Sequence, residues 1–172
     1  GASRAVARLG VTMFNVHAMG GLEMMKLAVE ASGEEADRLG KERPLVLAVT
    51  ILTSIDQRTM NKELRISGDV ESQVVHLANL AAAAGVDGVI ASPHEAVPIL
   101  AAVRRKMLIV APGVRPTWAG AYDQKRITTP AEAILNGASY LVIGRPITAA
   151  PSEIGTPVDA ARLIGEEIAT AL

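Results

Sequence analysis

The feature that most constrains the fold is a regular alternation of short apolar runs with helical patterns. The apolar runs read as strands and cover residues 11–17, 44–52, 87–92, 107–113 and 140–145. A helical pattern lies between each pair of runs. Unbroken apolar runs are typical of parallel strands that are buried on both faces. The alternation therefore predicts an α/β fold whose parallel strands are joined by right-handed crossovers.

The expected helices have clear start and stop signals. Helical patterns occupy residues 20–39, 69–84 and 157–171, and the motifs SPHE (92–95) and TPAE (129–132) each predict a further helix start. Both motifs place a hydroxyl at the cap, proline at the first helical position and glutamate at the third. At the beginning of the chain, helical spacing that stops at Gly10 predicts the last turns of a helix whose start is absent. A short helix behind a remnant of cloning is the alternative.

Composition limits the classes of protein to consider. The 172 residues suffice for a single domain over 1–172, and 49% are apolar although only 2% are aromatic, so small aliphatic side chains must form the core. A net charge of -1 without a basic stripe argues against nucleic acid as a partner. The absence of cysteine is compatible with a reducing, cytoplasmic location. No apolar run approaches the roughly 18 residues that a membrane span requires.

Two architectures fit this pattern. A TIM (β/α)8 barrel needs roughly 250 residues, so five units in this chain fit the C-terminal five-eighths of such a barrel, with the N-terminal units missing. An open doubly wound sheet of five strands needs no missing piece, and the pattern alone leaves both architectures open.

Polar residues follow the apolar runs at the end where parallel α/β folds bind ligands. They are Asn15, His17, Thr53, Ser54, Ser92, Arg115, Gly144 and Arg145. Each also has a plainer explanation: a buried histidine bonded to a carbonyl, a helix-capping hydroxyl, or an arginine in a surface ion pair. Several polar groups at one edge nevertheless favour a ligand site there.

The pair Gly144-Arg145 is the strongest single indication of an anion site. A glycine lets an oxyanion approach the backbone N–H, and a guanidinium binds phosphate through two hydrogen bonds. In barrels the loops after the last two strands often hold a phosphate. The first of those loops here also contains Arg115 and Gln124. The three histidines of the chain have no metal-ligand spacing, so we expect no metal.

Several motifs together resemble bacterial orotidine 5'-phosphate decarboxylase. They are NVHAMGG (15–21), LAVTILTS (47–54), DGVIASPHE (87–95), APGVRP (111–116) and DQKRITTPAEAILNGASYLVIGRPIT (123–148). The resemblance implies a TIM barrel that works as a homodimer without metal or organic cofactor. It also implies a carboxy-lyase that converts orotidine 5'-phosphate to UMP in pyrimidine biosynthesis.

The resemblance assigns the candidate residues to two halves of a nucleotide site. On the base side, Thr53 matches a contact to the pyrimidine with Ser54 beside it, Pro112 flanks the base, and His17 supports the site from behind.

On the phosphate side, Arg115 matches a substrate contact near the phosphate and Gln124 matches a glutamine that hydrogen-bonds it. Gly144 and Arg145 match the phosphate site inferred above from their chemistry.

One departure from the family is serious. The family's chemistry rests on an alternating Lys/Asp array that includes a D-x-K-x-x-D motif, and this motif is absent from the 172 residues. We expect the array upstream of Gly1, so that the parent enzyme decarboxylates its substrate and this chain alone does not. The alternatives are a sister phosphate-binding barrel such as a hexulose phosphate synthase, and a non-catalytic phosphate-binding or assembly module.

Overall fold

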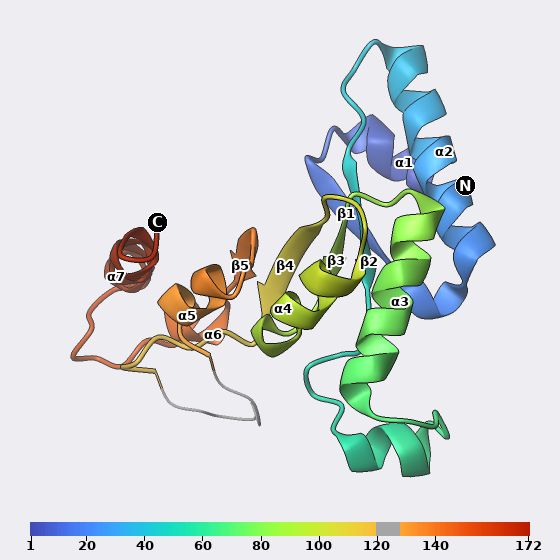
Figure 1. The fold of residues 1–172 in the computed structure, drawn as a ribbon. Coiled ribbons are helices and arrows are strands. Elements are labelled where there is room, and N and C mark those ends of the chain that lie inside the picture. Colours follow the sequence, from blue (N-terminus) through green and yellow to red (C-terminus); the bar gives the residue numbers. More distant parts are fainter. Residues whose placement is uncertain (120–127) are drawn as a thin grey trace.

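A computed structural model describes residues 1–119 and 128–172 and contains one parallel sheet (Figure 1). Its strands are β1 (Met13–His17), β2 (Leu45–Val49), β3 (Gly88–Ile90), β4 (Leu108–Pro112) and β5 (Tyr140–Val142). They lie in the order β1-β2-β3-β4-β5, and each is parallel to its neighbours. A doubly wound sheet reverses its strand order at a switch point, whereas this order follows the sequence throughout. The described sheet therefore has the winding of a barrel segment of five strands.

The register brings the carboxyl ends of the strands to one edge. His17 pairs with Val49, and Val49 pairs with Ile90. On the other side, Pro112 pairs with Val142. Residues that follow these strands are consequently close in space although they are far apart in sequence.

Nine helical segments accompany the strands in the described part of the chain. They are α1 (Ala2–Leu9), η1 (Ala18–Gly20), α2 (Leu22–Leu39), η2 (Thr59–Glu63), α3 (Val70–Ala84), α4 (Pro93–Ala102), α5 (Pro130–Leu135), α6 (Arg145–Thr148) and α7 (Pro157–Ala169). The expected end signal is confirmed at Gly10, whose φ of 73° ends α1 in the left-handed region. None of the described helices is long and apolar enough to cross a membrane.

The chain after β5 differs from the prediction. The apolar run 140–145 was expected to be one strand, but β5 ends at Val142 and Arg145 begins the short helix α6. Pro146 lies at the start of that helix, where proline is well tolerated because the first N–H groups need no helical partner. Gly144 and Arg145 thus belong to a strand-to-helix turn. The π-helical turn η2 was not predicted.

The core is aliphatic, as the composition requires. Its main cluster lies among β1–β4 and the helices α2–α4, and its largest fully buried apolar members include Met25, Met60, Ile99 and Ile109. A smaller cluster around Ala111, Val114, Ala133 and Ala138 joins β4 to α5. Helix α7 contacts α5 and α6, at the end of the molecule that carries β5 (Figure 1).

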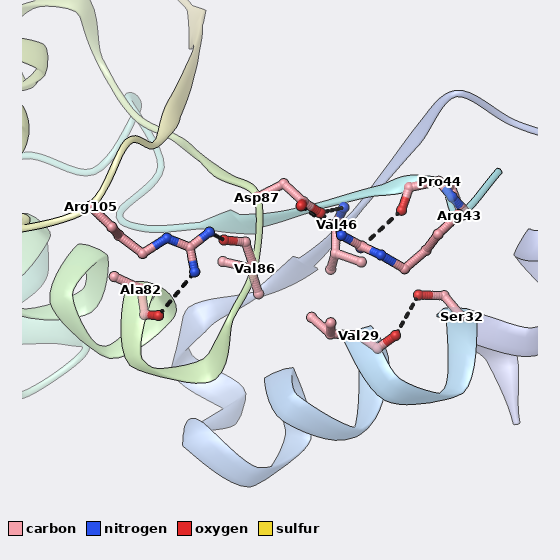
Figure 2. Close-up of polar contacts among 9 residues, drawn as sticks. All are labelled: Val29, Ser32, Arg43, Pro44, Val46, Ala82, Val86, Asp87 and Arg105. Atoms are coloured by element: carbon pink, nitrogen blue, oxygen red, sulfur yellow. Dashed lines mark hydrogen bonds and ion pairs between the residues drawn. The ribbon is translucent and has the colours of Figure 1, made fainter. Parts of the chain in front are cut away.

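Polar contacts fix the amino-terminal edge of the sheet (Figure 2). Arg43, just before β2, pairs with Asp87, just before β3. Arg105 donates from Nη2 to the carbonyl of Val86 at 2.7 Å and from Nη1 to that of Ala82 at 3.3 Å, which satisfies acceptors at the end of α3. This edge contributes to stability, and the candidate ligand site lies at the other edge.

Candidate functional site

A cavity of about 480 Å³ lies at the carboxyl ends of β1–β4. Its lining residues are Asn15, His17, Val49, Ile51, Leu52, Thr53, Ser54, Ile90, Ala91 and Pro112. Four of the predicted site residues are therefore brought together: His17, Thr53, Ser54 and Pro112. The sequence predicts that these residues lie at one edge of the sheet, and their shared cavity agrees with that prediction.

The strands determine which side chains reach the cavity. Asn15 and His17 are two residues apart on β1, so they share one face of the strand, and both are exposed. Thr53 and Ser54 lie in the turn after β2. The base of this turn is fixed by Thr50, whose N–H and hydroxyl both donate to the carbonyl of Ile90, at 3.1 and 2.9 Å.

The lining suits a flat and uncharged polar group. Hydroxyls, an amide and an imidazole supply hydrogen bonds, and the remaining lining side chains are apolar. No carboxylate, ammonium or guanidinium group belongs to this lining in the part of the chain that the structure describes. A nucleobase has this combination of apolar faces and hydrogen-bonding edges, whereas a strongly charged group would lose hydration here without an opposite charge.

Arg115 follows β4 by three residues and is not part of the cavity lining. Val114 forms a parallel bridge with Thr128, and the N–H of Arg115 donates to the carbonyl of Thr128 at 3.0 Å. The Nη1 of Arg115 donates to the carbonyl of Val114 at 2.9 Å, and the residue is only 4% exposed. A cation that is buried and bonded in this way has a fixed position, which favours a specific role over a mobile surface ion pair.

Gly144 and Arg145 begin α6 at the same edge of the sheet, also outside the cavity lining, and both are exposed. The carbonyl of Gly144 accepts hydrogen bonds from the N–H groups of Ile147 and Thr148, at 2.8 and 3.1 Å. Apart from its two chain neighbours, no described residue has an atom within 4 Å of the place where a Cβ on Gly144 would be. Close packing therefore does not explain this glycine, and open space for a ligand at the backbone is consistent with it.

The remaining predicted residue, Gln124, lies outside the described residues. The sequence identifies Asn15 only as a strand-end residue, and its place in the cavity lining was not predicted. The apolar lining residues were missed as well; the available signal was their position at or just after strand ends. Among the described residues, no group of three or more potential metal ligands occurs.

Comparison with known proteins gives a consistent result over almost the whole chain. Residues 2–162 match the model of the orotidine 5'-phosphate decarboxylase / HUMPS family. Relatives named orotidine 5'-phosphate decarboxylase include that of Heliobacterium modesticaldum, 52% identical over 99% of this chain and 69% of its own length. That of Moorella thermoacetica is 52% identical over 98% of this chain and 65% of its own length. The chain thus spans about two thirds of these relatives.

Solved structures agree with the described fold. The crystal structure of orotidine 5'-phosphate decarboxylase from Lactobacillus acidophilus is 35% identical and superposes with a TM-score of 0.80, covering 97% of this chain and 67% of that one. The structure from Methanocaldococcus jannaschii, 20% identical with a TM-score of 0.59, supports the fold alone. Five parallel βα units in sequential order therefore form part of a TIM barrel, and the chain belongs to the orotidine 5'-phosphate decarboxylase / HUMPS family.

Proposed function

We propose that this chain provides the nucleotide-binding part of an orotidine 5'-phosphate decarboxylase, a carboxy-lyase of pyrimidine biosynthesis. The observation that carries the proposal is the cavity at the carboxyl ends of β1–β4, in which His17, Thr53, Ser54 and Pro112 come together. Two arginines follow β4 and β5 at the same edge, which supports a ligand with an uncharged base and an anionic tail.

In the base half, Thr53 and Ser54 contact the polar edge of the pyrimidine and Pro112 packs against its face. His17 supports this arrangement from β1. Hydroxyl groups both donate and accept hydrogen bonds, so they suit the alternating donors and acceptors of a pyrimidine edge. The apolar lining at Ile51 and Ile90 would exclude water from the ring faces.

In the phosphate half, Gly144, Arg145, Arg115 and Gln124 hold the phosphate. The backbone N–H of a bare glycine and a guanidinium fork both match the geometry of phosphate oxygens. The proposal needs no metal or organic cofactor, because phosphate binding relies on these side chains and backbone groups.

The reaction needs groups that the chain lacks. In the family, an aspartate beside the substrate carboxylate disfavours the ground state, and a lysine stabilises and protonates the developing carbanion. The D-x-K-x-x-D motif is absent from this sequence. We therefore propose that catalysis belongs to the longer parent protein and that these 172 residues bind nucleotide without turnover.

A hexulose phosphate synthase is the second candidate, because a related barrel would share the phosphate site. The named relatives, all orotidine 5'-phosphate decarboxylases at about 52% identity, favour the first reading. We further propose that the protein is a homodimer, which rests on the resemblance to the family. We also propose that it lies in the cytoplasm, with which the absence of cysteine is compatible. Light scattering after size-exclusion chromatography measures the number of copies.

Calorimetric titration with UMP, uridine and ribulose 5-phosphate tests the proposal. UMP should bind more tightly than uridine because of its phosphate, and more tightly than ribulose 5-phosphate because of its base. Preference for ribulose 5-phosphate would instead indicate the synthase, and failure to bind either phosphate ligand would reject both readings. Incubation with carboxyl-labelled orotidine 5'-phosphate should release no labelled CO2, and any release above the protein-free rate would contradict the assigned lack of catalysis.

A further inference from the structure

A hydrogen bond joins the first turn of α4 to the segment that follows β4. The Nε2 atom of His94 lies 3.0 Å from Oγ1 of Thr128. His94 is exposed at the surface, whereas Thr128 is only 3% exposed. The bond therefore connects a surface imidazole to a buried hydroxyl, across 34 positions of sequence.

Thr128 is also the backbone partner of Arg115. Its carbonyl accepts the N–H of Arg115 at 3.0 Å, and it pairs with Val114 in a parallel bridge. The guanidinium of Arg115 in turn bonds to the carbonyl of Val114. Thr128 therefore helps to hold the backbone that carries the guanidinium of Arg115.

Helix α4 is a firm support for His94. The carboxylate of Glu95 accepts the N–H of Ser92 at 2.9 Å, and α4 buries Pro93, Ala96 and Ile99 in the core. By contrast, a cavity of about 340 Å³ lies beside Thr128, lined by His94, Thr128, Glu132, Leu135 and Asn136. Atoms do not pack against Thr128 from the side of this cavity, so the hydrogen bond to His94 adds a restraint there.

We propose that His94 is a positioning residue for Arg115: by bonding to Thr128, it holds the backbone that orients the guanidinium. The effect on ligand binding rests on the proposed function, in which Arg115 contacts the phosphate. The positioning of Arg115 does not rest on the proposed function, because it concerns only the backbone of this residue without ligand. The two parts therefore have separate readouts.

Amide hydrogen exchange tests the positioning without ligand. His94→Ala should speed exchange of the Arg115 amide three- to tenfold, the loss expected for one neutral hydrogen bond. The Thr50 amide, bonded to Ile90 at another wall of the site, should exchange as before. His94→Gln, which retains a hydrogen-bonding side chain, should restore most of the protection. The control His76→Ala removes an exposed histidine on α3 and should change neither amide.

Thr128→Val tests whether the bond itself is responsible. If it is, Thr128→Val should speed exchange at Arg115 as much as His94→Ala does, and the double variant should be no worse than either single one. Unchanged exchange at Arg115 in His94→Ala, or fully additive effects in the double variant, would overturn the inference.

Binding of UMP and uridine completes the test. His94→Ala should weaken UMP three- to tenfold and leave uridine unaffected, a split that general destabilisation of the fold would not produce. Faster exchange at Arg115 with equal losses for both ligands would support the positioning and reject the assignment of Arg115 to the phosphate. Failure of the proposed function is thereby distinguished from failure of this inference.

Discussion

Arg43 and Asp87 form a two-point ion pair at the amino-terminal edge of the sheet, opposite the candidate site (Figure 2). Nη1 lies 2.9 Å from Oδ2 and Nη2 lies 2.7 Å from Oδ1, and Oδ2 also accepts the N–H of Val46 at 2.7 Å. Burial opposes ionisation of this carboxyl, but Arg43 and the Val46 N–H outweigh it and hold the pKa of Asp87 below its usual value. The pair ties the start of β3 to the start of β2.

Replacement of Arg43 should therefore destabilise the fold. Arg43→Ala leaves the half-buried carboxylate of Asp87 without its charged partner, and we expect the free energy of unfolding to fall by about 1.5–3 kcal/mol. Arg162→Ala removes an exposed arginine with ion pairs on α7 and should change it by less than about 0.5 kcal/mol. Urea denaturation of both variants measures the difference. Equal losses would mean that the pair at the sheet edge contributes no more than a surface pair.

Glu35 should give the protein an acid-sensitive stability. The carboxylate is buried between α1 and α2, where its Oε1 accepts from Arg38 at 2.6 Å and from Arg8 at 2.7 Å. These bonds lower the pKa of Glu35 from 4.5 to about 2. At pH values between about 2 and 4.5, this carboxyl is protonated in the unfolded chain but still ionised in the folded protein. The stability that Glu35 contributes is therefore complete above about pH 4.5 and is lost as the pH falls toward 2.

Unfolding free energy measured against pH checks this prediction. Glu35→Gln should be less stable than the parent at neutral pH, and the gap should narrow as pH falls from about 4.5 to 2. Glu34→Gln, on an exposed neighbour in α2, serves as the control and should leave the acid-dependent fall in place. A gap that stays constant across this range would contradict the role given to Glu35.

Gly88 marks a close approach of strands, and its replacement should be costly. A Cβ there would lie 2.6 Å from the carbonyl oxygen of Leu108 and 2.7 Å from its Cβ, so β3 and β4 would have to separate. We expect Gly88→Ala to cost about 1–3 kcal/mol, as overpacking does. Gly165→Ala, in α7 with open space around it, should instead stabilise by about 0.5–1 kcal/mol. Thermal unfolding of the two variants should shift in opposite directions.

The parts of the fold that local sequence determines were predictable. Apolar runs located the five strands of the described sheet, and the helix starts predicted at SPHE and TPAE are confirmed by the capping boxes at Ser92 and Thr129. The order of the strands in the sheet could not be predicted from the sequence pattern, because an open doubly wound sheet and a barrel segment share the same local pattern. The predicted extent of the last strand was wrong. The apolar run continues to Ile143, but β5 ends at Val142 and the backbone then turns toward α6.

The candidate site likewise contains residues that the local sequence indicates and a contact that it does not. His17, Thr53 and Ser54 were identifiable as lining candidates because each follows or ends a strand, and parallel strands bring such ends together, whereas Pro112 came from the resemblance to the family. The contact of His94 with Thr128 was not identifiable, because the two residues come from different βα units. Only the register of β3 and β4 brings those units side by side.

Arg145 should discriminate between ligands with and without a phosphate. Arg145→Ala should weaken UMP by about 1.5–3 kcal/mol and leave uridine nearly unchanged, because a charge-assisted hydrogen bond is lost only with the phosphate. Arg145→Lys keeps the charge without the two-point geometry and should recover part of the loss. Arg104→Ala, an exposed arginine before β4 at the opposite edge, is the control for net charge. Similar effects of Arg104→Ala and Arg145→Ala would reduce the role of Arg145 to a general charge effect.

Gln124 should act on the phosphate as a neutral donor, and salt separates its role from that of Arg145. Gln124→Ala should weaken UMP by about 1.5–3 kcal/mol with little effect on uridine. Removal of a neutral amide leaves the net charge unchanged, so the salt dependence of UMP binding should stay as in the parent, whereas Arg145→Ala should reduce it. Titrations at low and high salt measure both quantities. Equal losses for UMP and uridine would remove Gln124 from the phosphate half of the site.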